Sequence, residues 1–325
     1  MKFLLQRLLR TLLLLLGLSV LCFLFTEMAP GSFFDEMRLN PQISPETIAL
    51  LRSRYGLDQP LPIRYVRWTL AAAHGDFGYS LAYDAPVGKL LLPRAKNTLL
   101  LTSVATVLSW ILALPLGIWS ASRRGRLIDR VIGTGTSVVI SVPEIVMAIA
   151  LLALAVRFRL GPVGGMMSLS LEDQSLYERI GDVCAHMMLP VSILVLGSAA
   201  IIERHVRAGV LEVLDSACIQ AARGLGIGRM RLLVYHVLPL AANSAISLLG
   251  FSLAGLLGGS LLVEAITGWP GLGPLILEAT LSRDLYVVIG GVMLSGVFML
   301  GGNFVADVLL LACDPRIRSG ESNEA

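Results

Sequence analysis

The chain has 325 residues, of which 55% are hydrophobic and only 15% are charged. Soluble globular domains carry about 25% charged residues, so this composition excludes an ordinary soluble protein. The four cysteines form no paired motif and the net charge is only +3, so the sequence predicts no disulfide framework, metal site, cofactor or nucleic-acid partner.

Six apolar segments are long enough to cross a bilayer, which takes about 20 mostly apolar residues in a helix. They lie at residues 8–28, 98–121, 131–156, 188–209, 237–263 and 285–312. The pattern predicts an all-α polytopic membrane protein, because a β-barrel would show alternating segments of about ten residues. The first segment lacks a small-residue cleavage site, so we expect a retained span rather than a signal peptide.

Lys and Arg gather before the first span, between the second and third, between the fourth and fifth, and after the sixth. Short loops rich in these residues stay on the cytoplasmic side of the membrane. We therefore expect both termini in the cytoplasm, with six spans between them.

The long segment 29–97 carries helix signals of its own. Ser44 is a candidate N-cap before Pro45, and Gly56 can end the helix that follows. Residues 62–73 repeat the helical spacing of apolar residues. We expect amphipathic helices on the outer face, with a mere linker as the alternative.

The second and third spans contain candidate pathway residues. Glu144 lies about thirteen residues into the third span, or ~20 Å along a straight helix, where an acid is costly and usually faces a cavity. It is expected to line the pathway and favour a cationic solute; pairing with another span, or a protonated acid, is an equally good alternative. Pro115 and Pro143 are candidate hinges, although simple packing defects remain open.

Residues 215–239 form an unusual element between two spans. Asp215 or Ser216 can cap a helix, Ala221 and Ala222 favour it, and Gly224 and Gly226 can end it in the left-handed conformation. A helix this short is unstable alone in water and needs a groove to sit in. The residues themselves leave two interpretations open, a coupling helix and an ordinary loop.

The chain is interrupted again after the fifth span, around Trp269, Pro270 and Gly271. This stretch predicts an outer turn with Trp269 at the membrane interface, and an external gate is the functional interpretation. Glycines within the fifth span, Gly255, Gly258 and Gly259, would permit close helix packing.

No phosphate-binding GxxxxGK[ST] motif occurs, because the single Gly88-Lys89 pair is followed by Leu90. Nucleophile and zinc motifs such as GxSxG and HExxH are absent as well. The sequence thus favours a non-enzymatic chain, and ATP would have to be hydrolysed by another one.

An ordered set of motifs covers nearly the whole chain. In the segment Gln220-Ala221-Ala222-Arg223 and Gly226, followed by Leu238-Pro239, the chain resembles the EAA loop of bacterial ABC-importer permeases, with Gln in place of the first Glu. The dipeptide, oligopeptide and nickel branch of this family is further matched by Ala29-Pro30-Gly31, residues 56–62, residues 75–80, Pro115-Leu116-Gly117-Ile118, His186, Leu189-Pro190, residues 211–214, Glu264, residues 269–273, Arg283-Asp284 and residues 314–318.

The resemblance implies a type I importer permease of the bacterial inner membrane that forms half of a pore for peptides. Its partners would be a second permease, two ATP-binding subunits and an external solute-binding protein. Residues 1–96 would hold the first span and external helices, 97–312 a five-helix core with the coupling helix at 216–229, and 313–325 a cytoplasmic tail.

Other interpretations remain. The same scaffold carries nickel or metal chelates, so the solute stays open. A secondary transporter would show intramembrane ion sites and often inverted repeats, neither of which is evident. A membrane enzyme would carry a nucleophile or metal motif, and this sequence has none. A transport assay would distinguish a permease from a purely structural subunit.

Overall fold

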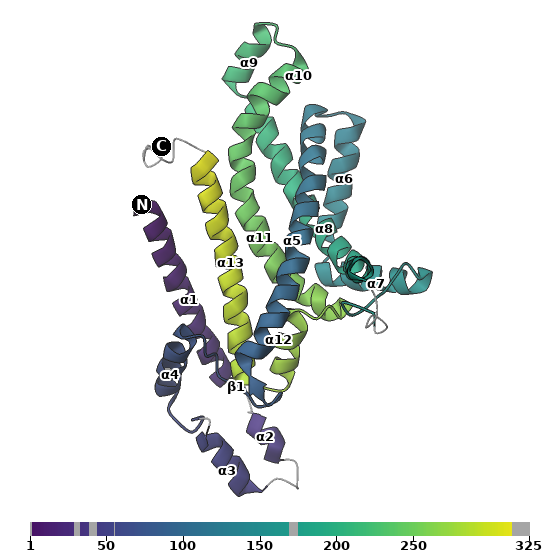
Figure 1. Cartoon of the computed structure of the whole chain (residues 1–325). Coiled ribbons are helices and arrows are strands. Elements are labelled where there is room, and N and C mark those ends of the chain that lie inside the picture. The colour runs from purple at the N-terminus through teal and green to yellow at the C-terminus, as the bar shows by residue number, and fades with distance from the viewer. Residues whose placement is uncertain (1, 29–32, 39–43, 55, 169–174, 314–325) are drawn as a thin grey trace. The chain divides into compact units, whose positions relative to one another are not determined.

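The computed structural model describes residues 2–28, 33–38, 44–54, 56–168 and 175–313 (Figure 1). Over these residues the chain is almost entirely helical, with one short hairpin. Five of the described helices are long and apolar enough to cross a membrane, or six spans if one bent helix pair counts as a span. The prediction of an all-α polytopic membrane protein is confirmed. Two quoted motifs, Ala29-Pro30-Gly31 and residues 314–318, lie outside the described residues.

The long helices match five predicted spans and extend beyond several of them. They are α1 (Lys2–Met28), α5 (Val87–Ser122), α8 (Leu176–Leu214), α11 (Leu238–Thr267) and α13 (Leu285–Cys313). With 36 and 39 residues, α5 and α8 exceed the length that a ~30 Å hydrocarbon layer requires. Their ends therefore project out of the apolar layer.

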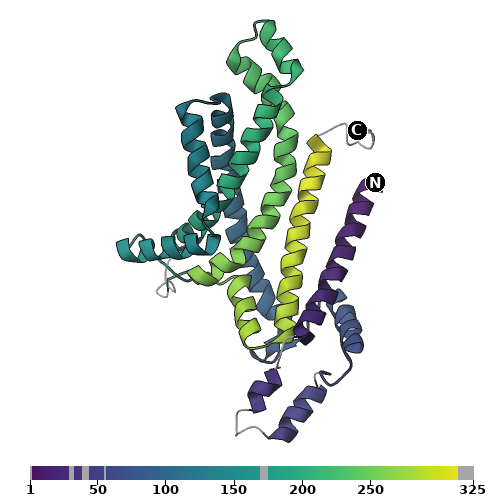
Figure 2. The same cartoon turned by 180° about the vertical axis from the view of Figure 1, so that it is seen from behind.

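The third predicted span is not one straight helix. It consists of α6 (Leu127–Ser141) and α7 (Glu144–Phe158), which are bent by 99° at the break between them (Figure 2). Pro143 has no N–H to continue the ladder, and Val142 before it is extended with φ −90° and ψ 122°. The prediction of a continuous helix over 131–156 is wrong, and Glu144 begins a new helix instead of lying in the middle of one.

The chain divides into two compact units. The first, called here the hairpin unit, comprises residues 1–98 and 270–298. Besides α1 it contains the elements α2 (Phe33–Arg38), α3 (Pro45–Arg54), α4 (Leu61–Ala73), β1 (Tyr79–Ser80), β2 (Ala85–Pro86) and α12 (Leu272–Leu281), together with the first parts of α5 and α13. The antiparallel strands pair Tyr79 with Pro86 and Ser80 with Ala85.

The predicted helices of segment 29–97 are confirmed as α3 and α4. The Thr47 N–H donates to Ser44 Oγ at 3.1 Å, as an N-cap requires, and Gly56 adopts φ +65° after α3. The Phe23 ring of α1 packs on Trp68 of α4 with centroids 5.2 Å apart, and Ile289 completes this core. Aromatic packing therefore fixes α4 against α1.

The second unit, called here the α8 unit, comprises residues 99–269 and 299–325. In it α8 packs against α6, α7 and α11. One buried cluster includes Ile193, Leu194 and Trp269, and another includes Ile202, Ile219 and Val237.

Trp269 has no exposed surface, so its predicted place at the membrane interface is wrong. Gly268 takes the left-handed conformation at φ 67°, and the Trp269 N–H then donates to the Glu264 carbonyl at 3.0 Å. This turn directs the indole into the core of the α8 unit.

Candidate functional site

A small helical segment joins the ends of α8 and α11 (Figure 1). It contains α9 (Ala217–Gly224), α10 (Arg229–Leu232) and the π-helical turn Leu233–Val237, and is called here the α9–α10 segment. Gly226 has φ +77°, which confirms a left-handed glycine after the helix. Gly224, by contrast, is the last residue of α9, so its predicted left-handed conformation is wrong.

The N-terminus of α9 has no side-chain cap. Ser216 occupies the cap position, but its Oγ donates to the Val213 carbonyl at 2.7 Å and accepts no α9 N–H. The predicted side-chain cap is therefore wrong. The Gln220 Nε2 donates to the Asp215 carbonyl at 3.1 Å, a bond that a carboxylate cannot make. This contact gives the departure from the first Glu of the motif a local structural role.

The two faces of α9 differ sharply. Ile219 is 1% exposed and Ala222 is half-buried against the same apolar cluster. Gln220, Ala221 and Gly224 are exposed, and with Ala217 they recur at the three- and four-residue spacing of one helix face. The outward face therefore consists of small residues and Gln220, while Ala222 points toward its own chain.

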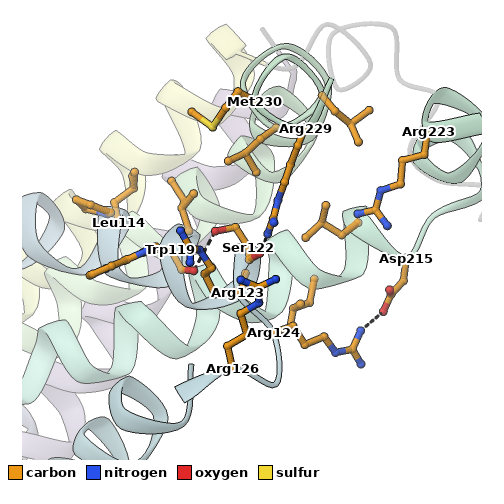
Figure 3. A pocket seen from close by; sticks show the side chains of 17 residues that line it. Leu114, Trp119, Ser122, Arg123, Arg124, Arg126, Asp215, Arg223, Arg229 and Met230 are labelled. Carbon is orange, nitrogen blue, oxygen red and sulfur yellow. Dashed lines mark hydrogen bonds and ion pairs between the residues drawn. The ribbon is translucent and has the colours of Figure 1, made fainter. Parts of the chain in front are cut away.

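An arginine-lined cavity of about 890 Å³ lies beside this segment (Figure 3). Its wall includes Pro115, and its rim includes Arg223 of α9 and Arg229 of α10. The Arg124 guanidinium pairs with Asp215 at 2.8 Å, and the Arg229 guanidinium donates to the Ser122 carbonyl. Two long-range contacts thus tie the α5–α6 turn to the segment.

A buried carboxylate secures the same turn. Asp129 is 7% exposed and accepts both Arg207 Nε at 2.7 Å and Arg207 Nη2 at 3.1 Å. Ser120 Oγ and the Gly125 N–H also donate to it, at 2.7 and 2.8 Å. This bidentate cluster joins α5, α6 and α8. Sequence analysis missed it, although an acid next to an arginine-rich turn was the available signal.

Glu144 lies at a second cavity of the α8 unit, about 330 Å³ in volume. The cavity is also lined by Pro143, Gly255 and two hydroxyl residues, Ser198 and Ser252. A Cβ added to Gly259 of α11 would lie 2.7 Å from Glu144 Oε2, so the glycine lets the carboxylate of α7 approach α11 closely. Close approach is thus seen at Gly259, whereas a Cβ added at Gly255 or Gly258 would meet no other described part of the chain within 4 Å.

The structure therefore separates the three pathway candidates. Pro143 and Glu144 share the smaller cavity, and Pro115 lines the arginine-lined one. Helix α5 continues through Pro115 without a break, while the chain bends at Pro143. A hinge is supported at Pro143 alone.

In the hairpin unit, two quoted motifs far apart in sequence meet. Asp284, at the start of α13, is 3% exposed and accepts Ser80 Oγ at 2.6 Å and the Ala82 N–H at 3.1 Å. The Tyr83 hydroxyl donates to Glu278 Oε2 at 2.6 Å. Burial, and then this bond to a carboxylate, raise the pKa of Tyr83 to about 12.

The external-gate candidates take separate structural roles. The Pro270 carbonyl accepts Asn97 Nδ2 at 2.8 Å, and Gly271 precedes α12 as a buried residue. The Leu272 N–H donates to Thr98 Oγ1 at 2.8 Å, so the start of α12 is held to α5. Trp269 belongs to the core of the other unit. A gate formed by these residues stays a prediction.

The helix order, the bent third span and the α9–α10 segment define an ABC-importer permease. The family described as "Binding-protein-dependent transport system inner membrane component" matches residues 113–319, and its N-terminal companion matches residues 1–102. The chain belongs to this family. It spans the membrane several times.

Relatives match almost end to end. The chain is 32% identical over 317 residues to the oligopeptide transport system permease protein AppB of Bacillus subtilis, covering 97% of this chain and 98% of that one. It is 32% identical over 335 residues to the dipeptide transport system permease protein DppB of Escherichia coli K12, covering 98% and 99%.

Solved structures agree on the fold. The inward-facing methionine ABC transporter MetNI is similar with a TM-score of 0.56 at 21% identity, over 69% of this chain and 96% of that one. A crystal structure of an amino acid ABC transporter with histidines gives a TM-score of 0.51 at 19% identity, over 69% and 94%. The predicted importer-permease fold is confirmed.

Proposed function

We propose that this chain is one pore-forming subunit of an ATP-driven peptide importer. The observation that carries the proposal is end-to-end similarity to permeases named for dipeptide and oligopeptide transport. The α9–α10 segment supports it, because a chain that only spans a bilayer has no use for a short, outward-facing helix. The chain itself is not an enzyme under this proposal.

The assembly we propose has four membrane-associated parts and one external part. This permease pairs with a second, homologous permease, and two ATP-binding subunits sit on the cytoplasmic side. A solute-binding protein delivers peptide from outside. Both termini lie in the cytoplasm of a bacterium and the spans in its inner membrane. Residues 1–96, 97–312 and 313–325 remain the proposed divisions of the chain.

Coupling is proposed to run through α9. Its outward face, with Ala217, Gln220, Ala221 and Gly224, sits in a groove of an ATP-binding subunit as a helix-in-groove contact. ATP-driven movement of that groove shifts the segment, and α8 and α11 carry the shift because the segment is continuous with both. The motif led us to expect docking through Ala222 and Gly226, but Ala222 packs against its own chain and Gly226 forms the turn after α9. Both are therefore proposed to shape the segment, while Arg223 lies beside the contact.

The smaller cavity is proposed to be part of the peptide pathway. A peptide carries a cationic amino end, and Glu144 is the acidic residue among the cavity's otherwise neutral lining. Ser198 and Ser252 offer hydroxyls, and apolar residues complete the wall. The bend at Pro143 allows α6 and α7 to change their relative angle as access alternates.

The function is tested by uptake of radiolabelled dipeptide and tripeptide into proteoliposomes that hold the full complex. We expect uptake that needs ATP and the solute-binding protein and that stops when the ATP-binding subunits are catalytically dead. Uptake driven by a proton gradient with dead subunits would identify a secondary transporter. Uptake of a nickel chelate but no peptide would overturn the proposed solute.

The pathway role is tested by Glu144→Gln, which keeps the volume and removes the charge. We expect slower uptake of peptides with a free amino end and little change for the same peptides N-acetylated. Gly259→Ala is the matched structural variant, because it crowds the carboxylate without removing it. Wild-type selectivity in Glu144→Gln would reject the role of the charge while leaving peptide import itself untouched.

A further inference from the structure

The arginine-lined cavity beside the α9–α10 segment has two chemically different parts (Figure 3). Five arginines line it, namely Arg123, Arg124, Arg126, Arg223 and Arg229. Asp215 is the acidic residue in the same lining and pairs with Arg124. The lining therefore carries a clear excess of positive charge.

Apart from Ser122, the rest of the wall is apolar and continues the surface of a membrane span. Leu114 and Trp119 belong to α5, within the apolar segment 98–121, and are 39% and 48% exposed. On the other side Met230 is 71% exposed. A tryptophan with an exposed face, next to arginines at the end of a span, is the arrangement found at membrane–water interfaces.

We infer that this cavity binds an anionic phospholipid, with the phosphate among the arginines and the acyl chains along Leu114 and Trp119. A guanidinium offers a planar pair of donors that matches phosphate oxygens. Basic pockets beside transmembrane helices are known to hold anionic headgroups. A free phosphate would use the charged rim but leave the apolar wall in water, which is why the lipid is favoured.

The proposed lipid would link the membrane to the α9–α10 segment. Arg123 and Arg126 come from the α5–α6 turn, whereas Arg223 and Arg229 come from α9 and α10. One headgroup that contacts both sets would hold the turn and the segment together, in addition to the Arg124–Asp215 pair. The inference needs only a multi-pass membrane protein, so it stands apart from the identity of the solute.

Trp119 provides a local readout. The purified full chain is placed in phosphatidylcholine bilayers that contain brominated phosphatidylglycerol, whose bromine atoms quench nearby tryptophans. Trp119→Phe identifies the Trp119 signal among the four tryptophans. We expect half-quenching of that signal at a far lower mole fraction of brominated phosphatidylglycerol than of brominated phosphatidylcholine.

The decisive variant is Arg123→Gln with Arg126→Gln, because both residues lie in the exposed turn and line the cavity. Each basic residue near a headgroup contributes about fivefold, so the double variant should weaken phosphatidylglycerol binding on the order of 30-fold. Arg130→Gln with Arg231→Gln removes the same charge at exposed positions outside the lining and should leave binding unchanged.

Four outcomes would overturn the inference. Equal quenching by the two brominated lipids would show no anionic preference, and equal weakening in both double variants would show only diffuse surface charge. Full competition by excess inorganic phosphate would assign the arginines to a free anion. Loss of quenching when ATP-binding subunits are added would assign the cavity to a protein partner. Failure of peptide uptake would not bear on any of these readouts.

Discussion

The hairpin around Asp284 and the α9–α10 segment are both short elements, and the chain holds them in opposite ways. At the hairpin, buried side chains satisfy one another: Ser80 has no exposed surface and Asp284 only 3%. On α9, one apolar residue, Ile219, is buried and most of the other side chains are exposed. The hairpin is complete within its own unit, whereas α9 offers a face that no described part of its own unit covers.

The difference shows that the hairpin makes its tertiary contacts within its own unit, whereas α9 leaves most of its surface without such contacts. A buried carboxylate that accepts several donors fixes one geometry, because each lost bond leaves an unsatisfied group. A two-turn helix with one anchor gains little from its own chain and is free to follow a partner. Structural fixation and the proposed mechanical coupling therefore fall on different segments.

The largest loss of stability should come from Asp284→Ala at the hairpin. This substitution leaves Ser80 Oγ and the Ala82 N–H without their buried acceptor, so the free energy of unfolding should fall by about 4 kcal/mol. Thermal unfolding of the purified chain in detergent measures the loss. Asp58→Ala, at an exposed position, is the control. Equal melting temperatures would mean that the hairpin is not fixed by this network.

Asp129→Ala should have the next largest effect. Arg207 loses its bidentate partner but stays partly solvated, since its side chain is 32% exposed, so we expect about 3 kcal/mol. Asp215→Ala breaks an exposed pair and should cost under about 1 kcal/mol. Similar losses for the two variants, in the same unfolding assay, would contradict the special role of the Asp129 cluster.

Ala221→Trp should leave folding intact and disturb coupling. A bulky ring on the outward face should cost about 2 kcal/mol of docking, or about 30-fold in affinity for the ATP-binding subunits. Binding, uptake and ATP hydrolysis of the reconstituted complex provide the measurement.

Ala222→Trp is the matched comparison for that variant. Ala222 packs against the apolar cluster of its own unit, so this change should lower the melting temperature first. Suppose that Ala222→Trp uncouples ATP hydrolysis from uptake without lowering the melting temperature, and that Ala221→Trp changes neither. The face of α9 that carries Ala222 would then be the docking face, contrary to our assignment.

The smallest expected effect is the loss of the Tyr83–Glu278 hydrogen bond at high pH. The pKa of Tyr83 is raised from 10.0 to about 12, so its hydrogen bond to Glu278 is present below pH 10 and is lost as pH rises from 10 toward 12. The ultraviolet difference between wild type and Tyr83→Phe should show this late ionisation. Glu278→Gln should bring the pKa partly back, because burial still raises it. Ionisation near pH 10 would indicate an unprotected hairpin.

Much of the fold followed from the sequence because its signals are local. Apolar length defined the spans, Ser44 and Gly56 marked the ends of α3, and Gly226 marked the turn after α9. The motif set also predicted the family that the comparisons support. These features depend on composition and backbone preference within a few residues, which a sequence displays directly.

Other outcomes depended on contacts that no local pattern contains. The 99° bend at Pro143 moved Glu144 from mid-helix to a helix start, and the turn at Gly268 buried a tryptophan expected at an interface. Ser80 and Asp284 met across 204 residues, and Asp129 met Arg207 across 78.

The sequence by itself determined where most of the long helices lie, which segments are apolar enough to cross a membrane, and which family they indicate. The tertiary structure decided which face of α9 is left open, which carboxylates are satisfied and where arginines gather around a cavity. The physical reason is range: helix formation is settled within a turn or two, whereas burial and charge pairing are settled by residues that only the folded chain brings together.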